Sequence, residues 1–207
     1  MTSRVRLAGL LCVAASGAGI HATCRARGEI EGLPRAMRIA YARRAMARET
    51  ITIARAELSS ATSRGLIAAL NAELSGAYAE PGANHFALDP TEVAPGRGAF
   101  LVVCLDGKPV GCGALRLLDD ETGELKRMYV APELRGRGLG RRLVAALEAE
   151  ALALGARRLV LETGVRQTQA LALYRNTGFH PIPLYGEYCL SPATSVCLGK
   201  ELAREAT

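Results

Sequence analysis

Seven stretches of the chain are predicted to be β-strands, because their apolar residues alternate with polar ones or form short apolar runs. They are residues 49–57, 99–105, 109–118, 124–130, 158–163, 181–190 and 194–202. The second and third are joined at Asp106-Gly107, a dipeptide typical of a tight hairpin turn. Short strands interspersed with helices predict a mixed α/β domain.

Between these strands, apolar residues return every three or four positions in three stretches, which predicts amphipathic helices. They are a helix starting at Ser59–Thr62, a helix over 141–154 and a helix over 168–177. The stretch 76–98 is rich in Gly, Pro, Asn and Asp, so we expect a loop or short helical turns. The order strand, loop, helix, strand over 124–163 predicts a right-handed parallel crossover.

The most informative motif of the chain is RGRGLG at 135–140, between a predicted strand and a predicted helix. Its glycines lack a Cβ, so the backbone can approach a phosphate closely. The first turn of the following helix offers unpaired N–H groups and partial positive charge. Arginines add formal charge at the same end: Arg135, Arg137, Arg141 and Arg142. The loop therefore predicts a diphosphate site.

The loop alone leaves open which diphosphate is bound. A dinucleotide fingerprint also follows a strand and begins a helix, and Glu162 lies at a suitable distance to bind a ribose. However, the third glycine of that fingerprint would fall at Arg141, and the preceding strand carries Lys126 and Arg127. A central parallel strand is usually apolar on both faces, so these charges count against the dinucleotide alternative.

Four stretches together resemble the GCN5-related N-acetyltransferase (GNAT) family. They are ELKRMYV at 124–130, the R-x-x-G-x-G pattern of Arg135, Gly138 and Gly140, RLVLETG at 158–164, and ALALYRNTGF at 170–179. The resemblance covers roughly residues 48–203. It implies a single domain over 46–207 with the GNAT fold: a mixed, mostly antiparallel sheet of about seven strands, with splayed central strands and flanking helices.

The resemblance implies an N-acetyltransferase that uses acetyl-CoA as co-substrate. The acetyl group would pass to a primary amine of a small molecule or amino acid by direct attack in a ternary complex. Gln167 stands where many relatives carry a cofactor-contacting Asn. The residues expected to bind acetyl-CoA are Met128, Tyr129, Val130, Arg135, Gly136, Arg137, Gly138, Leu139, Gly140, Arg141 and Gln167.

Two side chains match catalytic positions of the family. Glu124 corresponds to a general base on the fourth strand and would act directly or through a water molecule. Tyr174 corresponds to the tyrosine whose hydroxyl faces the thioester sulfur as general acid. A strand-end carboxylate paired with Lys126 and a tyrosine packed in the core are the structural alternatives for these two residues. The N–H of Met128 would stabilise the oxyanion.

The acceptor is the least defined part of the site. Candidate residues that would contact it are Asn84, His85, Phe86, Arg116 and Glu187. Glu187 could attract an ammonium and Arg116 could hold a carboxylate. A protein N-terminus or lysine side chain is the alternative acceptor. A GNAT-fold module that binds acyl-CoA without turnover is the alternative to an enzyme.

Composition excludes several other classes. The net charge of +6 is spread over many arginines, and the chain has only 6 Tyr and 3 Phe, so stacking on nucleic-acid bases is not expected. The 6 cysteines form no C-x-x-C pair and the 3 histidines show no ligand spacing, so no metal is expected.

The first 45 residues show no family pattern. An apolar stretch at 7–20 superficially resembles a secretory signal but is too short for a typical membrane span. Because acyl-CoA is a cytoplasmic metabolite, we expect a cytoplasmic protein without a membrane partner. Residues 1–45 are then an extension outside the domain, with translation starting near Met46. A homodimer through the last strands is the predicted assembly.

Overall fold

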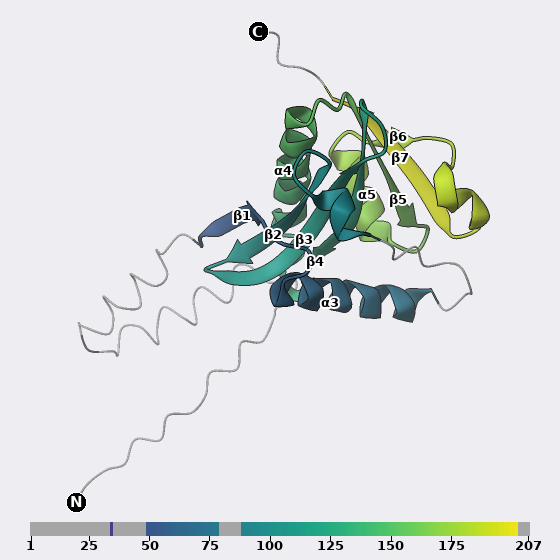
Figure 1. The fold of residues 1–207 in the computed structure, drawn as a ribbon. Helices are drawn as coiled ribbons and strands as arrows, with labels where there is room; N and C mark the ends of the chain where they lie inside the picture. Colours follow the sequence, from purple (N-terminus) through teal and green to yellow (C-terminus); the bar gives the residue numbers. More distant parts are fainter. Residues whose placement is uncertain (1–33, 35–48, 79–87, 203–207) are drawn as a thin grey trace, which may run out of the picture. The chain divides into compact units, whose positions relative to one another are not determined.

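The computed structural model describes residue 34 and residues 49–78 and 88–202 (Figure 1). The chain divides into two units at Arg48 and Glu49, and every element below belongs to the second unit. Apart from Pro34, the predicted extension over 1–45 lies outside the described residues.

One sheet of seven strands organises this unit, in the order β1-β2-β3-β4-β5-β7-β6. The strands are β1 (Ile51–Arg55), β2 (Gly98–Leu105), β3 (Lys108–Leu117), β4 (Thr122–Val130), β5 (Arg158–Gly164), β6 (His180–Pro181) and β7 (Ser195–Glu201). All neighbours pair antiparallel except β4 and β5, which pair in parallel. The mixed, mostly antiparallel sheet predicted from the sequence is confirmed.

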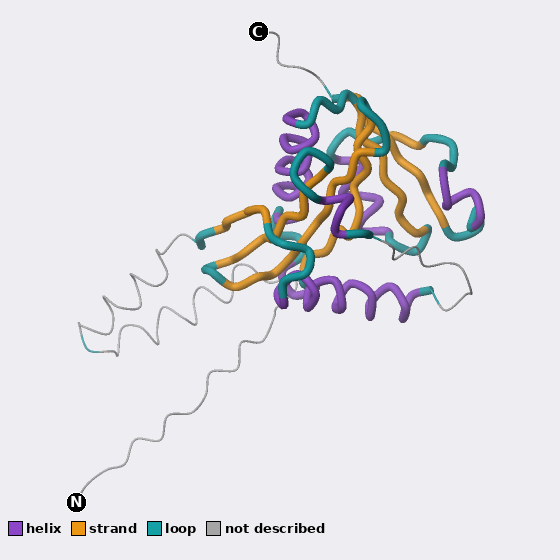
Figure 2. The backbone as a smooth tube through the Cα atoms, in the orientation of Figure 1, coloured by secondary structure: helices purple, strands orange, loops and turns teal. Residues whose placement is uncertain are grey.

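Helices cover both faces of the sheet (Figures 1 and 2). The α-helices are α3 (Ala61–Ala77), α4 (Leu139–Ala153) and α5 (Thr168–Asn176), and short three-ten helices are η1 (Pro90–Val93), η2 (Pro132–Leu134) and η3 (Gly186–Leu190). Helix α3 begins at Ser60, whose side chain caps the N–H of Ser63.

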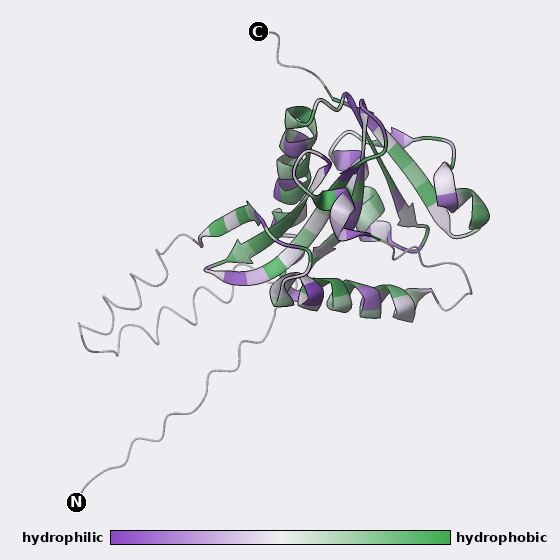
Figure 3. Ribbon diagram, viewed as in Figure 1, coloured by the Kyte–Doolittle hydropathy of each residue, from purple (hydrophilic) through white to green (hydrophobic). Residues whose placement is uncertain are grey.

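Strand β2 contributes to two cores because successive side chains point to opposite faces. Leu101 and Val103 pack with Leu143 and Leu147 of α4. On the other face, the alternate residues Phe100 and Val102 pack with Leu66 and Ile67 of α3. The alternation accounts for a strand that is apolar throughout and green along its length in Figure 3. The sheet is therefore the middle layer of the fold.

The hairpin between β2 and β3 has the turn that the sequence predicted. Asp106 and Gly107 have φ angles of 49° and 77°. Two consecutive positive φ values are the signature of a type I′ turn, which matches the right-handed twist of paired strands.

Strands β4 and β5 pair only over their first halves. The ladder runs from Thr122 opposite Arg158 to Leu125 opposite Leu161. Beyond it, β4 continues to Val130 and β5 to Gly164. We call these continuing segments, 126–130 and 162–164, the splay. The splay positions the candidate site.

A β-bulge in β4 lies at the start of the splay. Ala114 of β3 is opposite Lys126, whereas Cys112 is opposite Tyr129, so Gly113 faces two residues of β4. Arg127, the first of them, has a φ of 58°, which is rare for a residue with a side chain. A Cβ on Gly113 would lie 2.6 Å from Met128 Sδ, so the close packing here requires glycine.

The predicted strand over 181–190 is wrong. Strand β6 contains only His180–Pro181, and Gly186–Leu190 forms the three-ten helix η3. Prolines at 181 and 183 have no N–H to donate to a strand ladder. Gly186 then turns the chain with a φ of 52°. A smaller difference is that α4 begins at Leu139, so Gly140 lies inside the helix.

Candidate active site

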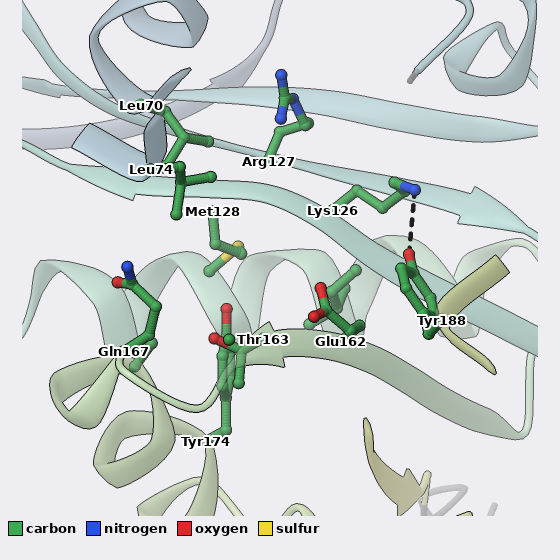
Figure 4. Close-up of a pocket in the computed structure, with 13 residues that line it drawn as sticks. Leu70, Leu74, Lys126, Arg127, Met128, Glu162, Thr163, Gln167, Tyr174 and Tyr188 are labelled. Carbon is green, nitrogen blue, oxygen red and sulfur yellow. Dashed lines mark hydrogen bonds between the residues drawn. The ribbon is translucent and has the colours of Figure 1, made fainter. Parts of the chain in front are cut away.

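A cavity of about 120 Å³ lies at the splay (Figure 4). It is bounded by α3, both splayed strands, the start of α5 and η3. Its lining residues are Leu70, Leu74, Leu125, Lys126, Arg127, Met128, Glu162, Thr163, Gly164, Gln167, Ala170, Tyr174 and Tyr188. Three of the residues predicted from the sequence line it, namely Met128, Gln167 and Tyr174.

Tyr174 places a hydroxyl in this cavity. Its ring is 4% exposed and packs edge-on against Phe179, with ring centroids 5.8 Å apart. Figure 4 shows the hydroxyl pointing from α5 toward the space between the strands. Burial raises the pKa of Tyr174, and the nearby charge of Glu162 raises it further. At neutral pH the hydroxyl therefore remains protonated and can donate a hydrogen bond.

Glu162 is the acidic residue that lines the same cavity. It directly follows Leu161, the last residue of β5 paired with β4. Burial raises the pKa of Glu162, while a hydrogen bond from Ser195 and the positive charge of Lys126 act in the opposite direction. A carboxyl group with a raised pKa in a cavity is a candidate for proton transfer.

The sequence considered Glu162 only as a ribose-binding acid in the dinucleotide alternative. A signal for a different role was present: it is the one acidic residue in the strand RLVLETG, and the apolar residues around it predict a buried strand. An ionisable group in such a strand needs a structural or functional reason.

Glu124 lies in the paired half of β4 and is completely buried. Its Oε2 accepts a hydrogen bond from Arg116 Nε at 2.6 Å. Its Oε1 accepts from the hydroxyls of Tyr185 at 2.8 Å and Tyr188 at 2.7 Å. Of these groups, Tyr188 lines the cavity. The carboxylate therefore joins β3, β4 and the η3 region, and it meets the cavity through Tyr188.

The two charged residues expected to bind the acceptor are paired within the protein. Arg116 bridges Glu92 and Glu124. Glu187 accepts a hydrogen bond at 3.1 Å from Lys126 Nζ, which also donates to the Tyr188 hydroxyl at 3.1 Å. These ion pairs connect the polar groups beneath the cavity. The other expected acceptor residues, Asn84, His85 and Phe86, lie outside the described residues.

The glycine-rich loop has the backbone geometry of an anion-binding turn. Gly136 and Gly138 have φ angles of 77° and 81°, and Gly138 caps α4 without a side-chain hydrogen bond. The first helical bond runs from Arg142 N to Gly138 O. The N–H groups of the preceding first turn, at Leu139, Gly140 and Arg141, therefore have no partner within the helix. They and the helix dipole favour an anion at this end.

The arginines of the loop differ in their surroundings. Arg135 Nε donates to Val130 O at 2.9 Å, and its guanidinium pairs with Glu73 of α3 at 2.6 Å. It therefore fixes the loop against the end of β4. Arg137 pairs with Glu49 near the surface. Arg141 is exposed on the first turn of α4.

The remaining predicted cofactor residues follow the bulge. Met128, Tyr129 and Val130 belong to the part of β4 that extends beyond the ladder with β5. Their N–H and C=O groups on that side have no β5 partner in the ladder, so an extended ligand with amide groups could pair there.

Among residues 49–78 and 88–202, no cluster of three or more His, Cys, Asp and Glu side chains has the arrangement of a metal site. No helix in the described part of the chain is long and apolar enough to cross a membrane.

Relatives in other organisms match most of this region. An IAA acetyltransferase from Azospirillum brasilense is 42% identical over 113 residues, which are 54% of this chain and 74% of that protein. An aminoglycoside N(6')-acetyltransferase type 1 from Stenotrophomonas maltophilia is 35% identical over 105 residues, 44% of this chain and 69% of that protein.

Solved structures agree with the fold. A Klebsiella pneumoniae protein described as an acyl-CoA N-acyltransferase superposes with a TM-score of 0.63 and 34% identity, covering 74% of this chain and 99% of that one. A GNAT family acetyltransferase from Elizabethkingia anophelis with acetyl-CoA bound superposes with a TM-score of 0.55 and 21% identity, covering 75% and 100%. At that identity, the second likeness concerns the fold alone.

The sequence profile of the acetyltransferase (GNAT) family matches residues 64–179, more than half of the 207-residue chain. The matched region begins in α3 and ends at Phe179, just after α5, so it contains the splay, the glycine-rich loop and Tyr174. The chain belongs to the GNAT acetyltransferase family.

Proposed function

We propose that this protein transfers an acetyl group from acetyl-CoA to the primary amine of a small molecule or amino acid. The observation that carries the proposal is the convergence of three features: an anion-binding loop, a splay with free strand edges, and a cavity containing Tyr174 and Glu162. The loop suits a diphosphate, the strand edge suits the amides of pantetheine, and the cavity suits the thioester. This reaction belongs in the cytoplasm, where acyl-CoA is available.

Proton removal from the amine is the first requirement of this chemistry. An alkylammonium has a pKa of about 10, so at neutral pH a base must accept its proton. We assign this role to Glu162, because it lines the cavity and its carboxyl is partly desolvated. The family resemblance assigned the role to Glu124. The buried contacts of Glu124 with Arg116, Tyr185 and Tyr188 favour a positioning role instead.

Bond exchange then follows directly. The neutral amine nitrogen attacks the thioester carbonyl carbon, the C–S bond breaks, and the products are an amide and the CoA thiol. Tyr174 donates a hydrogen bond to the sulfur as negative charge develops there. A thiol has a pKa of about 8.5 and the pKa of Tyr174 is raised, so stabilisation by a hydrogen bond is more favourable than early proton transfer. The N–H of Met128 is positioned by the bulge to stabilise the oxyanion.

Two alternatives define what the test must separate. A protein N-terminus or lysine side chain could be the acceptor instead of a small amine. A non-catalytic module would bind acyl-CoA without releasing thiol. Tyr174 and Glu162 favour the enzyme, because a binding module needs neither a hydrogen-bond donor at the sulfur nor a base beside it.

The test is a thermal-shift measurement on the full chain with acetyl-CoA, CoA, NAD or buffer, followed by thiol release over a panel of amines and peptides. We expect both CoA species to raise the Tm, with about 2.7 kcal/mol of stabilisation at one hundred times Kd, and NAD to have no effect. Amine-dependent thiol release supports the enzyme. Stabilisation by CoA without thiol release for any acceptor supports the binding module, and no CoA effect on folded protein contradicts both.

A further inference from the structure

A second cavity, of about 270 Å³, lies beside α3. Its lining residues are Leu58, Ser59, Arg64, Ile67, Leu88, Pro90 and Arg127. Four of these side chains are apolar, and the two ionisable ones are both arginines. An apolar ligand of this size that carries a negative group would match both the lining and its charge.

Arg127 lines both cavities. It occupies the bulge, where the additional residue of β4 redirects the strand's side chains. Lys126 contacts η3 through Tyr188 and Glu187, whereas the guanidinium of Arg127 donates to Asn71 Oδ1 of α3 at 2.6 Å. The bulge therefore directs two consecutive cationic side chains to different walls of the site (Figure 4).

The position of Arg127 requires energy from elsewhere in the structure. The residue is 8% exposed, has a φ of 58° and lies where burial lowers its pKa. A backbone in this region costs about 1–3 kcal/mol, and strained residues are concentrated at functional sites. A carboxylate beside the guanidinium would form a paired, bidentate interaction in a region of low dielectric.

Glu162 and Arg127 lie at nearly the same level of the splay. The parallel ladder ends at Leu125 opposite Leu161, so its register continues with Lys126 and Arg127 on β4 and with Glu162 and Thr163 on β5. A carboxylate on one strand thus faces a guanidinium one position further along the other. This arrangement matches a molecule whose amine and carboxylate are attached close together.

We propose that the acceptor is an amino acid with an apolar side chain, whose amine lies at Glu162, whose carboxylate binds Arg127 and whose side chain enters the second cavity. This inference rests on the proposed function and specifies its substrate class. An engineered apolar cavity of about 150 Å³ holds benzene, so 270 Å³ accommodates a branched aliphatic or aromatic side chain.

The first experiment compares acceptors on the unaltered full chain. Leucine and phenylalanine are measured against their amides, their decarboxylated amines and glycine, with kcat/KM for thiol release as the readout. A hydrogen-bonded charge pair is worth about 1.5–3 kcal/mol, so we expect the two amino acids to exceed their decarboxylated amines by about 10- to 150-fold. Equal kcat/KM values with and without the carboxylate would overturn the inference and leave the proposed function intact.

The second experiment changes each part of the proposed contact. Arg127→Met should lower the kcat/KM ratio of leucine to 3-methylbutylamine at least tenfold, and Arg127→Lys should restore part of it, because lysine keeps the charge but not the bidentate geometry. Ile67→Trp should lower the ratio of leucine to glycine by filling the second cavity. Leu152→Trp, at a 40% exposed position of α4, is the matched control and should alter neither ratio.

The outcomes are separable even if a variant does not fold, because the acceptor comparison needs no substitution. Acetyl-CoA binding without thiol release from any amine would contradict the proposed function. Thiol release that ignores the carboxylate, or an Ile67→Trp protein that binds acetyl-CoA and retains the leucine-to-glycine ratio, would contradict only the substrate class proposed here.

Discussion

The two halves of the β4–β5 pair differ in how they treat charge. In the paired half, Glu124 is completely buried, and its carboxylate accepts hydrogen bonds from Arg116, Tyr185 and Tyr188. In the splayed half, Glu162 faces a cavity and burial raises its pKa. One carboxylate is held by the protein, whereas the other is available to a ligand.

The difference teaches that the position of an acid relative to the end of the ladder is more informative than its place in a family motif. A carboxylate with several donors is stabilised in its ionised form and has little capacity to accept a proton. A carboxylate at the edge of a cavity exchanges protons more readily with a bound amine. Substitutions in the two halves should therefore affect different quantities.

The largest effect should come from Glu162→Gln. General-base catalysis contributes about 10²–10⁴-fold, so kcat should fall within that range while acetyl-CoA still binds. Because the base acts when ionised and burial raises its pKa, wild-type kcat/KM should rise with pH through a value above the ordinary glutamate pKa of about 4.3. A pH profile of kcat/KM measures this limb, which should disappear in the variant.

Stability gives the control for Glu162→Gln. The raised pKa means that Glu162 favours folding below its unfolded pKa, and this contribution is lost as the pH rises through its folded pKa. Glutamine does not ionise, so the variant should melt at a higher temperature than the wild type at pH 8. An unchanged acid limb in Glu162→Gln, with the limb lost in Glu124→Gln, would return the base role to Glu124.

The next largest effect should come from Glu124→Ala, and it should appear in stability. Removing one partner of a buried ion pair costs about 3–5 kcal/mol, because Arg116 would lose its buried partner and the two tyrosine hydroxyls would lose their acceptor. Urea unfolding measures the loss. Arg55→Ala removes an exposed pair with Glu150 and should cost less than about 1 kcal/mol. A similar cost for both variants would contradict the distinction between the two halves.

A smaller effect is expected for Gly138→Ala in the glycine-rich loop. A Cβ at this position meets no atom within 4 Å, so the cost arises from the φ of 81° alone. For a residue with a side chain this conformation costs about 1–2 kcal/mol, and we expect acetyl-CoA Kd to rise by about tenfold. Isothermal titration measures the change.

Gly65→Ala within α3 is the matched control for the loop substitution. Its Cβ also meets nothing within 4 Å, but its φ is ordinary for a helix, so alanine should stabilise the helix slightly. If Gly138→Ala binds acetyl-CoA as tightly as Gly65→Ala does, the left-handed loop geometry is not needed for the cofactor.

The smallest effect should come from Arg137→Ala. Its guanidinium pairs with Glu49 at the surface, where the two side chains are 40% and 50% exposed. Exposed ion pairs are worth about 0–1 kcal/mol and are screened by salt. Acetyl-CoA Kd should rise less than about fivefold at physiological salt, by about 1 kcal/mol at most. A hundredfold rise in a titration would mean that side-chain charge, rather than backbone, holds the diphosphate.

Local patterns were sufficient to predict most of the fold. Asp106-Gly107 indicated its hairpin because few residues tolerate two positive φ values in succession. Gly155 and Gly178 indicated where two helices end, and both have a positive φ. The failure at 181–190 arose because alternation was given more weight than Pro181 and Pro183, which cannot donate to a ladder.

The site was less predictable, because it depends on where two strands part. The loop and Tyr174 have local signatures. The parting of the strands after Leu125 and the bulge at Arg127 depend on long-range register, which no window of sequence contains. Without that register, Glu124 and Glu162 are both acids in strands, and their different surroundings cannot be distinguished.

The bulge at Arg127 also sets the phase of the last part of β4. After it, Met128 and Val130 pack with the α4 core, and Tyr129 packs with the α3 core. A strand with residue 127 deleted could keep its length and hydrogen bonds, yet each of these three side chains would turn to the opposite face. A single codon therefore separates a strand that presents this cavity wall from one that presents its mirror pattern.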